Sequence, residues 1–156
     1  MALWFECKVR YDKMQENGVV KRVNEPYIVD ALSFTEAESR IIEEIKPYIS
    51  GDFTISAVKK TKIAEIFFDQ TGDRFYHVKY NIITLDEKSG AEKRTTVLNL
   101  VQASDFDSAL SNFQEGMKGT MADFEVAAII ETQVMDVFPL KLGVKQPSEA
   151  SAPAAE

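Results

Sequence analysis

The sequence has few of the residues that most often carry metal or covalent chemistry. Its 156 residues include one cysteine, Cys7, and one histidine, His77. A single cysteine excludes a disulfide framework within the chain and a cysteine-based zinc site, and it is typical of a reducing compartment. There is also no Walker lysine loop, no G-x-G-x-x-G and no G-x-S-x-G motif. We therefore predict no metal, no cofactor and no catalytic residue.

Positive charge and long hydrophobic runs are also scarce. Lysine and arginine number 18 against 25 acidic residues, which gives a formal net charge of −7. This balance argues against a general coat for duplex DNA, because phosphate binding needs a basic face. No run approaches the roughly 18 apolar residues of a membrane span, and the first residues lack the pattern of a secretion signal. We expect a cytoplasmic protein with no membrane partner.

The chain contains an internal similarity. Residues 4–67 align with residues 75–138 if one inserted residue in the second copy is later compensated. Aromatic, glycine and basic positions stay in step: Trp4 with Phe75, Lys8 with Lys79, Gly18 with Gly90, Lys21 with Lys93, Arg22 with Arg94, Phe34 with Phe106, Phe53 with Phe124 and Phe67 with Phe138. This predicts a single globular domain over residues 1–140, made of two repeats at about 4–68 and 75–138. Residues 141–156 are predicted to be a disordered tail, because their composition cannot support a packed core.

Each repeat is predicted to run strand, strand, helix, strand. Apolar residues alternate along the first strand, Asn17-Gly18 indicates a hairpin turn, and Ser33 and Asp105 are helix-capping residues. One long last strand, bent near Lys59-Lys60, is expected over Phe53 to about Phe68, and another over Phe124 to Phe138. The predicted fold is α+β, with a largely antiparallel sheet, two helices packed on one face and a pseudo-twofold axis. The predicted core comprises Phe5, Val9, Tyr11, Phe34, Ile41, Ile45, Phe53, Ile55, Tyr76, Val78, Tyr80, Phe106, Phe113, Phe124 and Val126.

The outer faces of the two leading strands carry an aromatic residue followed four positions later by lysine. Rings interleaved with cations are the parts of a surface that binds single-stranded nucleic acid, because bases stack on rings while cations contact phosphates. The alternative is that Trp4 and Phe75 are buried in a second layer and the lysines extend to solvent. The candidate binding residues are Trp4, Lys8, Arg10, Lys21, Arg22, Phe75, His77, Lys79, Lys93 and Arg94.

These features favour a non-enzymatic binding or interaction module in the cytoplasm. Three kinds of partner stay open: a second copy of the chain in a homodimer, a single-stranded nucleic acid, or a protein. Three more specific functions stay open: single-stranded nucleic-acid binding through the aromatic and basic face, small-ligand binding in a cleft between the two repeats, and an enzyme whose carboxylates only the fold brings together. Cys7 lies on the predicted core face, where a free thiol acts as a small hydrophobic residue.

Two segments, Trp4 to Tyr11 and Glu25 to Glu38, resemble an uncharacterised domain family of Bacteroidetes bacteria. The similarity continues through Thr84 to Arg94, Glu115 to Met121 and Met135 to Pro139, and it covers residues 1–140. The resemblance implies an intracellular bacterial protein. It implies no function, because the family has no assigned activity. The duplicated strand-strand-helix-strand pattern is also similar in topology to the paired modules of GyrI-like small-molecule binders.

Overall fold

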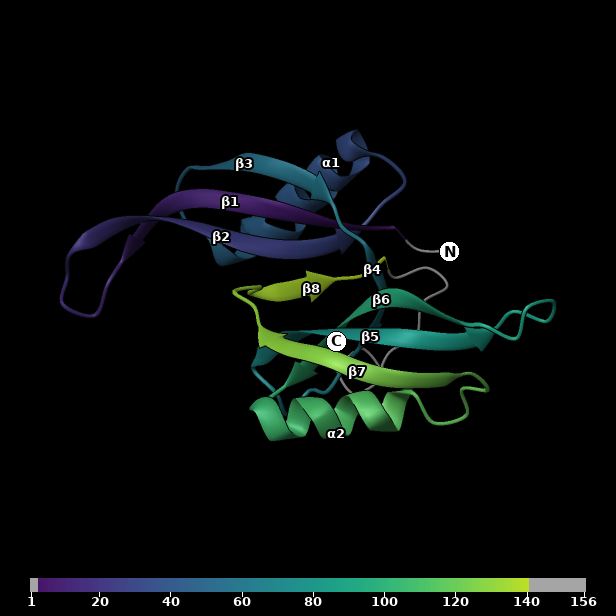
Figure 1. The fold of residues 1–156 in the computed structure, drawn as a ribbon. Helices are drawn as coiled ribbons and strands as arrows, with labels where there is room; N and C mark the ends of the chain where they lie inside the picture. The colour runs from purple at the N-terminus through teal and green to yellow at the C-terminus, as the bar shows by residue number, and fades with distance from the viewer. Residues whose placement is uncertain (1–2, 141–156) are drawn as a thin grey trace. The chain divides into compact units, whose positions relative to one another are not determined.

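The structure, a computed structural model, describes residues 3–140 and contains two compact units (Figure 1). Unit 1 comprises the described residues up to Lys62 together with those from Gln133 onward. Unit 2 comprises Ile63 to Thr132. The predicted disordered tail, residues 141–156, lies outside the described residues.

Unit 1 is a four-stranded sheet with one helix against it. The sheet has the order β3-β1-β2-β8, in which β8 is parallel to β2 and the other neighbours are antiparallel. Its elements are β1 (Trp4–Met14), β2 (Val20–Asp30), α1 (Phe34–Ile45), the 3-10 turn η1 (Lys46–Tyr48), β3 (Phe53–Lys60) and β8 (Asp136–Phe138).

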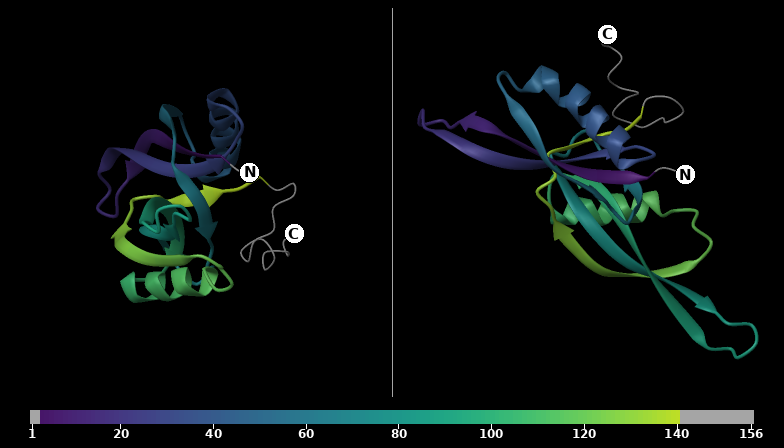
Figure 2. Two further views of the ribbon diagram at one scale, coloured as in Figure 1. Left: turned by 45° about the vertical axis from the view of Figure 1, so that its right-hand side comes forward. Right: turned by 90° about the horizontal axis from the view of Figure 1, so that it is seen from above.

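Unit 2 has the same plan. Its sheet has the order β4-β6-β5-β7, with β4 parallel to β6 and the other neighbours antiparallel. In each unit the hairpin of the two long strands extends well beyond the helix (Figure 2). The elements are β4 (Ile63–Phe67), β5 (Arg74–Leu85), β6 (Glu92–Ala103), α2 (Phe106–Gly116) and β7 (Asp123–Glu131).

The prediction of one sheet bearing both helices is wrong: there are two sheets, each with its own helix. The two predicted long strands each break, after Lys60 and after Glu131. At both breaks a threonine ties the chain to the start of the unit's first strand. Thr61 Oγ1 donates to the Trp4 carbonyl, and Thr132 Oγ1 donates to the Phe75 carbonyl, both at 2.8 Å. The residues after each break then join the other unit's sheet as its parallel edge strand, β4 or β8.

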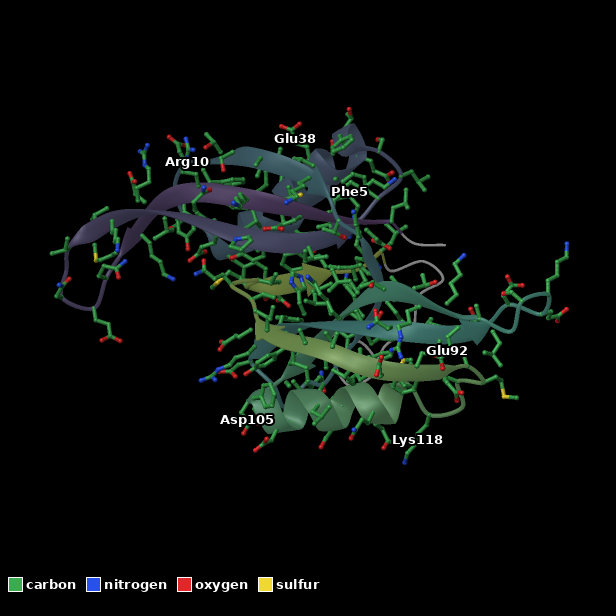
Figure 3. All side chains as sticks on the ribbon, in the orientation of Figure 1. Phe5, Arg10, Glu38, Glu92, Asp105 and Lys118 are labelled. Atoms are coloured by element: carbon green, nitrogen blue, oxygen red, sulfur yellow. The ribbon has the colours of Figure 1, made fainter. Side chains whose placement is uncertain are left out.

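The helix starts are confirmed. Ser33 Oγ accepts a hydrogen bond from the Glu36 amide at 3.1 Å, and the Glu36 carboxylate accepts one from the Leu32 amide at 2.8 Å. At α2, Asp105 Oδ1 accepts from the Ser108 amide at 2.8 Å. Asp105 and Lys118 mark the two ends of this helix in Figure 3. These bonds satisfy amide groups that a helix end leaves without a backbone partner.

The core of each unit lies between its helix and one face of its sheet. In unit 1 it contains Phe5, Cys7, Val9, Tyr27, Val29, Ala31, Ala37, Ile41 and Ile45, and in unit 2 it contains Tyr76, Val78, Tyr80, Val101, Ala103, Ala109, Phe113 and Met117. Three predicted core residues, Phe34, Phe106 and Val126, are instead exposed. Phe34 and Phe106 are the first residues of their helices. Each fits the apolar periodicity of its helix. At the helix end, however, the side chain lies at the edge of the layer that packs on the sheet.

Cys7 gives a direct test of this core. Its side chain is fully buried, with Sγ 4.0 Å from the Ala37 carbonyl oxygen, and burial raises the pKa of its thiol to about 12. Since the thiolate is the reactive form, we expect native protein at pH 8 to resist a disulfide-exchange reagent that labels guanidinium-unfolded protein completely. Equal labelling rates for the native and unfolded chains would contradict the buried position.

Candidate functional site

The predicted aromatic and basic stripe is divided in the structure. Trp4 and Phe75 are 8% and 2% exposed, so neither ring is available for a base to stack on. His77 is partly buried, whereas Lys8, Arg10 and Lys79 are exposed. Of the two alternatives for Trp4 and Phe75, the structure therefore supports burial. Nucleic-acid binding by the exposed cations stays a prediction.

The remaining candidate cations lie on the long hairpins, close to carboxylates. Arg22 pairs with Asp12 at 3.1 Å, and Arg94 pairs with Glu92 and Glu125. Lys21 and Lys93 are exposed. Arg10 and Arg22 are brought together at an open hollow of about 350 Å³ that is lined by residues of β1, β2 and the start of β3, and Asp12 and Asp52 lie there as well. Arg10 is labelled on this part of β1 in Figure 3. The acidic neighbours offset the positive charge that a phosphate ligand would need.

A different site lies where β8 passes the end of α1. A hollow of about 160 Å³, called here the aromatic hollow, is lined by Tyr27, Ile45, Tyr48, Met135, Asp136 and Phe138. Ile45 is the last residue of α1, and Tyr48 ends the 3-10 turn that follows it. Pro47 fixes the backbone of that turn and donates no hydrogen bond. The turn thereby places the Tyr48 ring beside β8 rather than in the helix-sheet core.

Three rings form a stack along one side of the aromatic hollow. The centroids of Tyr27 and Phe138 are 5.8 Å apart with an interplanar angle of 16°, and those of Phe138 and Tyr48 are 6.4 Å apart at 22°. Tyr27 is buried, whereas Tyr48 is 73% exposed. The stack therefore leads from the core to the surface, and its outer ring is available to another molecule.

A buried carboxylate holds the inner ring in place. Glu25 accepts hydrogen bonds from the hydroxyls of Tyr11 at 2.9 Å and Tyr27 at 3.4 Å, and from Lys13 Nζ at 3.2 Å. Burial and the nearby Glu25 raise the pKa of Tyr11 to about 12 and raise the pKa of Tyr27 as well. Both phenols therefore stay protonated at neutral pH and donate to Glu25. This network fixes the hydroxyl end of Tyr27, whose ring is stacked on Phe138.

Asp136 supplies charge at the rim of the aromatic hollow. It is the register partner of Tyr27 across the parallel β2–β8 pair, and its Oδ1 accepts from the Val137 amide at 2.8 Å. Burial of the carboxyl raises the pKa of Asp136, and the Glu44 carboxylate raises it further. The residue is nevertheless solvent-accessible. A carboxylate in this setting gains from any positive charge placed beside it.

Arg40 of α1 fixes β8, and with it two walls of the aromatic hollow. Its Nη1 donates to the Asp30 carbonyl and to Asp30 Oδ1, both at 2.8 Å, and to the Phe138 carbonyl at 3.2 Å. Its Nη2 donates to Glu44 at 3.0 Å and to the Pro139 carbonyl at 3.4 Å. The Leu140 amide donates to Asp30 Oδ1 as well. These bonds hold a strand of only three residues against the sheet.

The corresponding positions of unit 2 carry different chemistry. The partner of the edge strand there is Asn99, beside Glu65, where unit 1 has Tyr27 beside Asp136. Asn99 is fully buried; its Oδ1 accepts from the Tyr80 hydroxyl at 3.4 Å, and among the described residues its amide nitrogen has no hydrogen-bond partner. Unit 2 thus has the buried amide of Asn99 at the position where unit 1 has the stacked ring of Tyr27. The aligned pair Tyr27 and Asn99 was the sequence signal that could have indicated the site.

The fold and this site together define an α+β protein of two four-stranded sheets with an aromatic and carboxylate-lined hollow in one unit. The chain belongs to a family described as a domain of unknown function, DUF4494, whose family model matches residues 3–140. The chain has no significant match among curated proteins or among solved structures.

Neither helix within residues 3–140 has the length and apolar character needed to span a membrane. In the same part of the chain, no three histidine, cysteine, aspartate or glutamate side chains gather where they could hold a metal ion.

Proposed function

We propose that the protein is a non-enzymatic, cytoplasmic small-ligand-binding module and that the aromatic hollow is its binding site. The observation that carries this proposal is the stack of three rings, which ends in the largely exposed Tyr48 and is fixed at its inner end by Glu25. A concave, mostly apolar surface with few polar groups is typical of ligand sites. Rings held in place before binding lose little conformational freedom when a ligand arrives.

The volume of the hollow limits the ligand to a small molecule. The hollow, at about 160 Å³, is smaller than the roughly 300–1,000 Å³ typical of pockets for drug-sized ligands, so it is suited to a fragment-sized molecule. Every residue lining it belongs to unit 1. The proposal therefore differs from the predicted cleft between two repeats, and it needs only one unit to form the site.

The single-stranded nucleic-acid function receives less support. Base stacking on exposed rings contributes about 1–3 kcal/mol per base, and the burial of Trp4 and Phe75 removes this contribution. Binding would then depend on exposed cations such as Lys8, Arg10 and Lys79, and it would weaken steeply with salt. A salt-sensitive oligonucleotide titration in which Lys8→Glu with Lys79→Glu abolishes binding would favour this function instead.

We also propose that the two units arose by internal duplication. They have the same strand order. The pairing of the first strand with β3 or β7 also shifts register at matching positions, between Lys8 and Val9 and between Lys79 and Tyr80, because β3 and β7 each carry one extra residue there. On this proposal the aromatic hollow is a specialisation of one copy, because Asn99 occupies the position of Tyr27 in the other.

The proposed function is tested by a fragment screen. A mixed library of neutral, anionic and cationic fragments is added to isotope-labelled full-length protein, and amide shifts are recorded by NMR. We expect hits to shift the amides of Tyr48, Met135 and Phe138 together, and Tyr48→Ala to abolish those shifts. Phe34→Ala is the matched control, because it removes another exposed ring of unit 1 at the opposite end of α1. A screen without hits, or hits that are unaffected by Tyr48→Ala, would contradict the proposal.

A further inference from the structure

We propose that the ligand of the aromatic hollow is a small organic ammonium ion. This inference rests on the proposed function and specifies the chemical class of its ligand. It is drawn from two features of the same surface: the exposed ring of Tyr48 at the end of the stack and the carboxylate of Asp136. Each feature attracts positive charge independently of the other.

The rings are suited to a cation that carries apolar groups. The face of a tyrosine or phenylalanine ring has negative electrostatic potential and attracts an ammonium ion placed within about 6 Å of its centre. Tyr48 offers an exposed ring at the mouth, and Ile45, Phe138 and Met135 offer apolar contacts for the methyl or methylene groups of such an ion. A strongly hydrated metal ion would bind weakly to this surface, because the lining provides almost no oxygen ligands.

The charges around the aromatic hollow favour a cation over an anion. Three carboxylates lie in or beside it: Asp136 at the rim, Glu44 of α1, whose charge acts on Asp136, and Glu25, which bonds to Tyr27. Two cations of this region are already paired, since Arg40 contacts Asp30 and Glu44, and Lys13 contacts Glu25. Among the ion pairs of the described residues, none includes Asp136.

Asp136 is therefore the carboxylate that a ligand would neutralise. In the free protein, burial and Glu44 raise the pKa of its carboxyl. A cation bound beside the ionised form would lower that pKa again, since an opposite charge favours the charged state. By linkage, binding is then strongest where Asp136 is ionised and weakens as the pH falls through its raised pKa.

The experiment compares choline with 3,3-dimethyl-1-butanol, its uncharged analogue of nearly the same shape, on full-length protein by NMR titration. We expect choline to shift the amides of Tyr48, Met135 and Asp136, and to bind about tenfold or more tightly than the alcohol, which corresponds to a cation–π and carboxylate contribution of about 1.4 kcal/mol. Tetramethylammonium serves as a second cationic probe and should shift the same amides.

Two variants separate charge from shape. Asp136→Asn keeps the oxygen that accepts from Val137 and removes the charge. It should therefore weaken choline binding about threefold, the carboxylate's part of the preference, and leave binding of the alcohol unchanged. Glu65→Gln is the matched control, because Glu65 occupies the equivalent register position on β4 beside Asn99. It should change neither affinity.

The outcomes distinguish this inference from the proposed function. Equal binding of choline and the alcohol, or choline binding unaffected by Asp136→Asn, would overturn the ammonium ligand while leaving a ligand site in place. Failure of both cations to bind, together with fragment hits at Tyr48, would do the same. If neither these probes nor any fragment shifts the amides of the aromatic hollow, the proposed function itself is wrong.

Discussion

Arg40→Ala is expected to lower the free energy of unfolding by about 3–5 kcal/mol, the cost typical of breaking a buried ion pair by removing one partner. The substitution leaves the Asp30 carboxylate, which is buried, without its guanidinium partner. It also removes the donors to the carbonyl groups of Phe138 and Pro139. Since β8 has only three residues and pairs with one strand, these contacts make up much of what holds it.

Urea unfolding followed by circular dichroism measures this change. Arg22→Ala is the control: Arg22 forms an exposed pair with Asp12 on the hairpin, and such pairs contribute about 0–1 kcal/mol. A loss in Arg40→Ala no greater than the loss in Arg22→Ala would show that the Arg40 contacts do not hold β8. If they do hold it, Arg40→Ala also weakens binding at the aromatic hollow, because Asp136 and Phe138 belong to the same strand.

The parts of the fold that depend on local chemistry were predictable from the sequence. The Asn17-Gly18 turn connects β1 and β2, and Ser33 and Asp105 cap the two helices. Each of these features depends on residues a few positions apart. The parallel edge strands could not be predicted in this way. No proline or glycine interrupts residues 53–68, and apolar residues recur on both sides of Lys60. The sequence therefore indicates one long strand where the chain leaves one sheet and enters another.

The aromatic hollow was missed for a related reason. Its walls come from β2, the end of α1 and β8, and they meet only because Tyr27 pairs with Asp136, far away in the sequence. Arg40 was equally difficult to recognise. A charged residue on an amphipathic helix is normally assigned to the solvated face, and Arg40 is largely buried because β8 lies beside it. A pairing between distant segments thus determines both the site and the residue that secures it.

Aromatic residues of α2 show the same difference between periodicity and packing, and they give the second large expected effect. Phe106 and Phe113 both fit the apolar stripe of the helix and were both predicted to be core residues. In the structure Phe113 is fully buried and its ring contacts those of Phe67, Tyr80 and Phe124, with centroids 6.2, 5.0 and 5.8 Å away. Phe106 is 52% exposed. The two residues therefore allow a comparison within one helix.

Phe113→Ala is expected to lower the free energy of unfolding by about 3–5 kcal/mol, because it removes a buried ring and leaves a cavity among three others. Phe106→Ala should cost less than about 1 kcal/mol, since an exposed side chain loses little burial on truncation. Urea unfolding of both variants, with hydrogen exchange of the β5 and β6 amides, measures the difference. Alanine has a higher helix propensity than phenylalanine, so a loss of stability in either variant does not come from helix propensity. Equal losses in the two variants would contradict the packing of unit 2, whereas a large loss in Phe113→Ala alone would place the ring at the centre of that core.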